Sequence, residues 1–153
     1  MISLESSTVS RPILALNSAE DRVQLVLGLD MEILFAQEIR GSSRTIRVLP
    51  RALEHCFQET GVRPRELGGV ACVLGPGTFT GLRVSIALAA GLARGGSIPL
   101  AGLEYLPLLA TGPALHPGRE VWVCTHARKG LLYVQGFCPA DGQALTRIAV
   151  LTL

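Results

Sequence analysis

The sequence lacks a long uninterrupted apolar segment and carries little charge, and each absence excludes a class of protein. Charged residues make up only 17% of the chain and the formal net charge is +2, so no strong basic field indicates nucleic acid or a membrane surface. The longest apolar stretch, residues 84–93, falls well short of the roughly 20 residues that a transmembrane helix needs. Because the N-terminus carries Glu5 and lacks a basic segment before an apolar core, we expect no signal peptide and a cytoplasmic location.

Metal and disulfide patterns are also missing. The four cysteines form no C-x-x-C pair, and three of them lie in apolar patterns, which favours reduced, buried thiols. The three histidines are scattered, and the H-E-x-x-H pattern of a metalloprotease is absent, so we expect no metal site. The residues concerned are Cys56, Cys72, Cys124, Cys138, His55, His116 and His126.

What the chain does contain is typical of a packed globular protein. Of its 153 residues 48% are hydrophobic, enough for one domain or for a domain plus part of another. We expect a polar, frayed leader at residues 1–11 and a first domain at 12–110. A linker rich in glycine and proline follows at 111–118, before a partial second domain at 119–153.

The apolar periodicity predicts a mixed α/β first domain. Three closely spaced strands form an antiparallel meander, and helices then alternate with strands. A second three-strand meander repeats this opening without the helices that should follow. The expected strands are 12–16, 23–29, 33–39, 70–74, 98–101, 121–125, 131–137 and 144–151, and the expected helices are 43–60, 80–94 and 104–110.

Both long helices have unusual faces. In the first, Ser42 or Ser43 is a plausible N-cap, Pro50 predicts a kink or a local adjustment, and an arginine stripe forms either a solvated face or a docking surface. The helix at 80–94 is apolar nearly all round, which indicates burial on more than one side. One side can cover the sheet, and the other needs the neighbouring helix or a partner protein.

A glycine turn separates the strand at 70–74 from this second helix. Backbone N–H groups at a helix start can face an anion, so Gly75-Pro76-Gly77 is either a phosphate-binding loop or only a tight turn. The complete motif loop comprises Gly75, Pro76, Gly77, Thr78, Phe79, Thr80, Gly81 and Arg83.

The order of these elements matches the actin-like ATPase and ribonuclease H-like fold. The motif G-P-G-T-F-T-G-L-R-V at residues 75–84 resembles the signature of the TsaB family of tRNA threonylcarbamoyladenosine biosynthesis proteins. Segments 13–18, 47–50, 98–103 and 126–130 are also similar to family segments. The chain ends at Leu153 with roughly half of the family's second domain, which indicates a truncated chain or a reduced member.

The resemblance implies a non-catalytic subunit. Its partner would be the paralogue TsaD, which transfers the threonylcarbamoyl group to tRNA with help from a small ATPase, TsaE. The positions of the metal-binding histidine pair of TsaD fall near Glu104 and Leu108, and Asn17 stands where the fold carries an aspartate. We therefore expect no catalytic residue, no required cofactor, at most weak adenine nucleotide binding, and only indirect contact with tRNA.

The resemblance also implies an interface. Family members pair through the two long helices of the first domain, so we expect a heterodimer with TsaD and a homodimer in its absence, with TsaE joining the TsaB–TsaD complex. The expected interface residues are Ile46, Leu49, Leu53, Leu82, Ile86, Ala89, Ala90 and Ala93.

The rival interpretation is a nucleotide-dependent ATPase or phosphotransferase of the actin-like fold. The glycine loop at a helix start supports it. Asn17 opposes it because a neutral amide cannot supply the charge that a hard cation needs. Asp21 could substitute, although an aspartate in a turn is more often a turn residue.

Overall fold

A computed structural model describes residues 10–41, 45–112, 119–138 and 142–152, without the side chains of Thr45 and Ile46. The helices are α1 (Thr45–Thr60), α2 (Phe79–Gly96) and α3 (Tyr105–Ala110), with a short 3₁₀ helix η1 (Pro64–Glu66). The strands are β1 (Ile13–Asn17), β2 (Arg22–Leu29), β3 (Glu32–Arg40), β4 (Gly69–Gly75), β5 (Leu100–Glu104), β6 (Val121–Arg128), β7 (Leu131–Phe137) and β8 (Ala149–Thr152).

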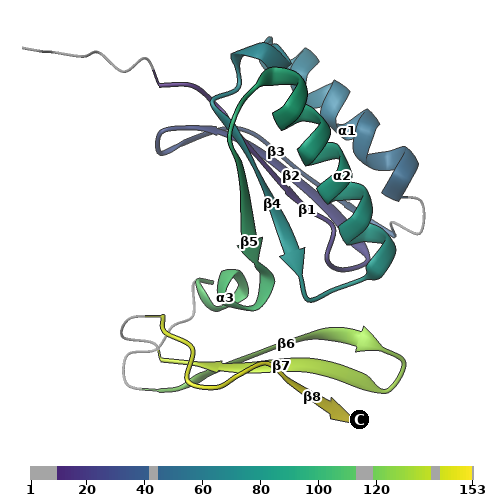
Figure 1. Cartoon of the computed structure of the whole chain (residues 1–153), viewed down its shortest axis with the longest axis vertical. Helices are drawn as coiled ribbons and strands as arrows, with labels where there is room; N and C mark the ends of the chain where they lie inside the picture. Colours follow the sequence, from purple (N-terminus) through teal and green to yellow (C-terminus); the bar gives the residue numbers. More distant parts are fainter. Residues whose placement is uncertain (1–9, 42–44, 113–118, 139–141, 153) are drawn as a thin grey trace, which may run out of the picture.

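The first domain is a five-stranded sheet with both long helices on one face (Figure 1). The strand order is β3-β2-β1-β4-β5, in which β1, β2 and β3 pair antiparallel, and β4 runs parallel to both β1 and β5. The meander followed by helix, strand, helix and strand confirms the predicted fold class.

A second, antiparallel sheet of order β6-β7-β8 lies below the first, with α3 between the two (Figure 1). Leu106 and Ala110 of α3 pack against Phe137 of β7, and all three are buried. The second meander is therefore attached to the first domain through α3. The predicted leader and linker lie mostly outside the described residues.

The main core lies between the first sheet and the two long helices. Leu14 and Leu16 of β1 and Leu25 and Leu27 of β2 alternate with residues on the opposite face, and their side chains are almost fully buried. Leu49, Ala52, Leu53 and Cys56 of α1 and Ala89 of α2 belong to the same cluster. Burial of these side chains fixes the two helices on the sheet.

Three strand predictions were wrong in their bounds by more than one residue. β6 was expected to end at residue 125 but continues to Arg128. β5 begins at Leu100, two residues later than predicted, and continues to Glu104. The last strand was predicted at 144–151, but β8 covers only Ala149–Thr152, and Ala144 forms an isolated bridge with Phe137. Thr146 interrupts the ladder, since its hydroxyl accepts a hydrogen bond from the Gly136 N–H and its carbonyl accepts one from Gln135.

The end of α2 also differs from its prediction. Gly95-Gly96 was expected to end the helix, yet both residues are helical, and Ser97 ends it in a left-handed conformation with φ 50°. The Ile98 N–H donates to the Ala93 carbonyl (2.9 Å), and the Ile98 side chain packs against the core. This contact, more than glycine flexibility, sets the end of the helix. α1 continues through Pro50 as one helix.

The thiols follow their prediction only in part. Cys56 and Cys72 are buried, and burial raises the pKa of Cys56 to about 11 and also raises that of Cys72. Cys124 is exposed on β6, so the expectation of a buried thiol is wrong there. In the part of the chain that the structure describes, no helix is long and apolar enough to cross a membrane.

Candidate docking face and glycine corner

The glycine motif forms a sharp corner between β4 and α2. β4 ends at Gly75, whose φ of 116° lies in a region that residues with side chains rarely adopt. Thr78 is the N-cap residue and α2 begins at Phe79. The sequence motif therefore corresponds to one structural unit, as predicted.

This corner packs directly on the turn between β1 and β2. The Thr78 N–H donates to the Ala19 carbonyl (2.6 Å), and the Thr78 hydroxyl donates to the Ser18 carbonyl (3.2 Å). A Cβ atom added to Gly77 would overlap the Ala19 carbonyl oxygen, and one added to Gly81 would overlap that of Ser18. Only glycine permits this close approach of two backbone segments.

The packing bears on the two interpretations of the motif. Carbonyl oxygens of Ser18 and Ala19 face the start of α2, where a bound anion would need to approach the backbone N–H groups. An anion and a carbonyl oxygen compete for the same donors. The geometry therefore favours a tight packing corner over a phosphate-binding loop.

Asn17, which stands where the fold carries an aspartate, has a structural role in the same turn. Its side-chain oxygen accepts a hydrogen bond from the Ala19 N–H (2.9 Å), which forms an Asx turn, and its amide donates to Gln24 (2.8 Å). Both polar atoms of the side chain are thus engaged within the protein. Asp21, the possible substitute, is exposed, and its carbonyl accepts a hydrogen bond from the Gly41 N–H.

Glu20 connects this turn to the second sheet. Its carboxylate accepts hydrogen bonds from Arg22 and from the hydroxyl of Thr125 on β6 (3.1 Å). The buried Tyr105 hydroxyl also bonds to Glu20, and burial, followed by the Glu20 carboxylate, raises the pKa of Tyr105. We name Glu20, Arg22, Tyr105 and Thr125 the interdomain clasp.

Replacing Glu20 by glutamine should lower the free energy of unfolding by about 2 kcal/mol, because hydrogen bonds to a charged acceptor each contribute about 1.5–3 kcal/mol. Urea unfolding of the purified protein measures this change. The matched control is Asp21→Asn in the same turn, whose side chain is exposed and which we expect to change stability by less than about 0.5 kcal/mol. Equal stability of the two variants would contradict a role for the clasp.

The helical interface residues predicted from the sequence divide into two groups. Leu49, Leu53, Ala89 and Ala93 are buried against the protein's own sheet, so they are not accessible to a partner in this fold and that part of the prediction is corrected. α2 has two apolar sides, and the sequence alone did not indicate which one faces the sheet. Leu82 and Ile86 are half-buried, Ala90 is exposed, and the side chain of Ile46 lies outside the described residues.

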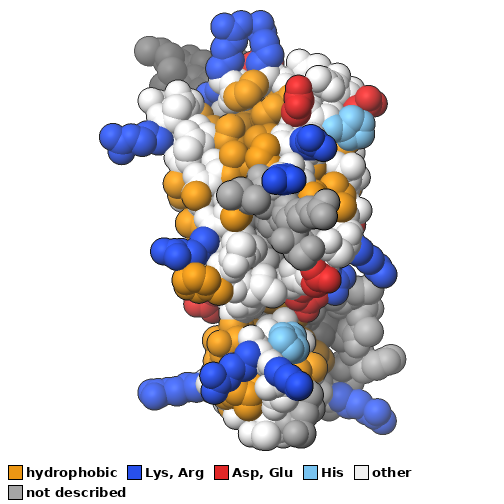
Figure 2. Space-filling model, turned by 90° about the vertical axis from the view of Figure 1, so that its right-hand side faces the viewer, with side chains coloured by type: hydrophobic (Ala, Val, Ile, Leu, Met, Phe, Trp, Pro, Cys, Tyr) orange, Lys and Arg blue, Asp and Glu red, His pale blue; other side chains and the backbone are white. Residues whose placement is uncertain are grey.

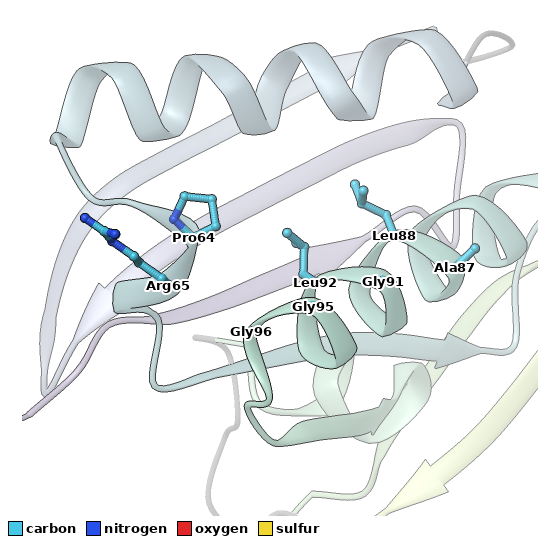
Figure 3. Close-up of a pocket in the computed structure, with 8 residues that line it drawn as sticks. All are labelled: Pro64, Arg65, Ala87, Leu88, Gly91, Leu92, Gly95 and Gly96. Carbon is cyan, nitrogen blue, oxygen red and sulfur yellow. The ribbon is translucent and has the colours of Figure 1, made fainter.

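The outer side of α2 carries a shallow groove of about 390 Å³. Leu88 and Leu92 point to the side on which Pro64 of η1 lies, and the helix backbone is exposed at the glycines (Figure 3). A Cβ added to Gly91 or Gly95 would meet no atom within 4 Å. The complete lining is Pro64, Arg65, Ala87, Leu88, Gly91, Leu92, Gly95 and Gly96.

The face that carries both long helices shows this groove as part of an apolar band (Figure 2). Hydrophobic side chains gather between scattered charged ones, and a second shallow hollow between α1 and η1 includes Phe57 and Val62. We call this surface, which comprises the α2 groove and the adjoining side of α1, the helical face. Sequence reasoning missed Ala87, Gly91 and Gly95, although their spacing of four residues was a usable signal.

The charges around the helical face are mostly basic. α2 contains Arg83 and Arg94 and no acidic residue, and Arg65 borders the groove. The Glu66 carboxylate next to it is engaged by Arg63, whose hydrogen bond lowers the pKa of Glu66 to about 2. Arg83 also stacks on Phe79, with its guanidinium carbon 4.7 Å from the ring centroid.

The opposite face of the sheet contains another hollow, of about 490 Å³. Ala15, Val26, Ala36, Val73 and Leu103 give it an apolar lining. Its polar edge is a row across three strands, in which Asn17 donates to Gln24 and Gln24 donates to Glu38. These groups bond to one another, whereas the Oε1 of Gln37, which also lines the hollow, is buried and has no hydrogen-bond partner within the described residues.

The positions that correspond to a metal-binding pair do not form a metal centre. Glu104 is exposed at the end of β5, and Leu108 lines the hollow on the open sheet face. No group of three histidine, cysteine, aspartate or glutamate side chains that could hold a metal ion occurs among the described residues.

Comparison with known proteins gives two kinds of sequence match. The profile of the family described as "TsaD: tRNA N6-adenosine threonylcarbamoyltransferase" matches residues 41–149. The chain is also 30% identical over 122 residues to the tRNA threonylcarbamoyladenosine biosynthesis protein TsaB of Escherichia coli K12. This alignment covers 79% of this chain and 52% of the TsaB protein. The chain therefore spans about half the length of this curated relative.

Two further matches differ in what they cover. A tRNA N6-adenosine threonylcarbamoyltransferase of Nitratidesulfovibrio vulgaris is 49% identical over 58 residues, or 37% of this chain and 16% of that protein. The structure of YeaZ from Pseudomonas aeruginosa superimposes with a TM-score of 0.81 at 23% identity, over 93% of this chain and 68% of that one. The latter supports the fold.

Proposed function

Because the chain belongs to the tRNA N6-adenosine threonylcarbamoyltransferase family, in which its matches over most of its length are TsaB proteins, we propose that it is a non-catalytic subunit of tRNA threonylcarbamoyladenosine biosynthesis. Its role is to bind and stabilise a TsaD-type transferase. A subunit of this kind works in the cytoplasm and contacts tRNA only through its partner.

The observation that carries the proposal is the exposed apolar surface of α2. A helix that is partly apolar on its outer side is more stable when a second surface covers it. The groove at Gly91 and Gly95 lets a partner helix approach the α2 backbone closely, since no side chain projects there. In the absence of TsaD, the same face would pair with a second copy of the chain.

The residues at the positions where related enzymes bind metal or phosphate support a non-catalytic role. Asn17 is engaged in its own turn, and Leu108 has no atom that can bind a metal ion. The glycine corner packs on the β1–β2 turn. These features favour a supporting role over a catalytic one.

Co-expression of an affinity-tagged form of this chain with the TsaD-type protein of the same organism tests the proposal. We expect the two proteins to purify together in equal amounts, and added TsaE to join this complex but not the isolated chain. Purification of the tagged chain alone, with TsaD soluble in the same lysate, would rule out the proposed role.

The ATPase alternative makes a separate prediction. Calorimetric titration of the chain with ATP and magnesium should give no micromolar binding, because the Ser18 and Ala19 carbonyls face the α2 start and Asn17 supplies no charge for the metal. TsaE is a suitable positive control. A dissociation constant in the micromolar range would revive the alternative.

A further inference from the structure

Phe79 and Arg83 belong to the glycine motif, yet the corner does not need their side chains. The Phe79 side chain is 71% exposed at the first position of α2, and Arg83 one turn later is also exposed. The guanidinium of Arg83 lies over the ring at 4.7 Å from the centroid. The aromatic surface is therefore turned outward and supported from one side only.

An exposed phenylalanine in this position is held in place before any partner arrives. The start of α2 is fixed to the β1–β2 turn through Thr78 and through the close approach at Gly77 and Gly81. The cation–π contact with Arg83 further restricts the ring. A side chain that is already ordered loses less conformational entropy on binding, which is the usual property of an interface anchor.

Phe79, Arg83, Ala87, Gly91 and Gly95 follow one another at intervals of four residues, so they share one ridge of the helix. At one end of this ridge Phe79 and Arg83 have large side chains, whereas at the other end the small residues Ala87, Gly91 and Gly95 line the groove. Arg83 lies one turn before Ala87, which lines the groove, so a surface that covers this end of the groove can also reach the pair.

The charges indicate what the pair would contact. α2 carries arginines and no acidic residue, so a complementary surface presents carboxylates around an apolar pocket. A nucleic acid is the less favoured occupant, because phosphate binding normally needs several clustered cations and the whole chain has a net charge of only +2.

We propose that Phe79 and Arg83 anchor the helical face to its protein partner, with the ring entering an apolar pocket and the guanidinium meeting a carboxylate at the rim. This inference rests on the proposed function, since the partner is the TsaD-type protein. It adds the chemistry of the surface that the partner must offer.

Calorimetry with the purified 153-residue chain and its TsaD-type partner tests the anchor. Phe79→Ala and Arg83→Ala should each weaken binding about 10- to 30-fold, whereas the control Thr80→Ala, exposed on the same turn, should leave it unchanged. Arg83→Glu should weaken binding more than Arg83→Ala, and added salt should weaken the wild-type complex more than that of Arg83→Ala. Because both side chains are exposed, the melting temperature should change little.

The outcomes separate the anchor from the proposed function. If both alanine variants bind as the wild type does, while a bulky substitution in the groove abolishes binding, the helical face stands and the anchor is wrong. If the wild type does not bind TsaD, the proposed function itself fails. Loss of binding to a tRNA anticodon stem-loop in these variants, with TsaD binding unchanged, would overturn the anchor in favour of a nucleic-acid contact.

Discussion

Replacing Gly81 by alanine should destabilise the protein by at least about 3 kcal/mol, the largest stability effect that we expect of a single methyl group in this chain. The added Cβ would overlap the Ser18 carbonyl oxygen and crowd the Thr78 hydroxyl. A carbonyl oxygen belongs to the backbone and cannot rotate away, so either α2 or the β1–β2 turn must move. Urea unfolding of the purified variant measures the loss.

Gly91→Ala is the matched control, because it makes the same chemical change in the same helix. Gly91 is exposed, and the new methyl group would meet no atom within 4 Å. Alanine favours a helix over glycine by about 1 kcal/mol, so this variant should be more stable than the wild type. If Gly81→Ala were as stable as Gly91→Ala, the corner would not depend on close packing.

Replacing Gly91 by arginine should abolish binding to a TsaD-type partner, with a loss of affinity of at least about 100-fold. The long charged side chain would fill the groove and keep a partner helix away from the α2 backbone. Because the position is exposed and open, the variant should fold with a melting temperature close to that of the wild type. Calorimetry and thermal unfolding of the same sample check both statements.

The control for this prediction is Met31→Arg, which introduces the same side chain at a position that is 99% exposed in the β2–β3 turn. It should bind the partner as the wild type does. Equal loss of binding in both variants would point to a general effect of charge, and unchanged binding in Gly91→Arg would show that the groove is not used. A charge at Ala89 or Ala93 would be a poor test, since both are buried and the variant would unfold.

Much of the fold could be predicted because local patterns determine it. The apolar alternation of the first three strands and the glycine turn between a strand and a helix are both local features, and the order of the elements along the chain followed from them. The motif at residues 75–84 was specific enough to indicate TsaB proteins, and the relatives confirm that family.

The remaining features depend on contacts between distant residues. Glu20 and Thr125 are 105 residues apart, so nothing in the sequence could indicate the clasp. Gly77 and Gly81 were recognised as motif residues, but their contact with Ser18 and Ala19 needs the three-dimensional structure.

The orientation of α2 is a second example. Both of its sides are apolar in the sequence, and the choice between them is made by the sheet, which buries Ala89 and Ala93 and leaves Ala87 and Gly91 outside.

The central claim is that this chain is a docking subunit whose helical face binds a TsaD-type transferase. The most direct test mixes the two purified proteins at tens of micromolar and separates the mixture by size-exclusion chromatography. Multi-angle light scattering then measures the mass of each peak. We predict one peak with the mass of a 1:1 complex for the wild type and two separate peaks for Gly91→Arg. Two separate peaks for the wild-type mixture, with both proteins folded, would contradict the claim.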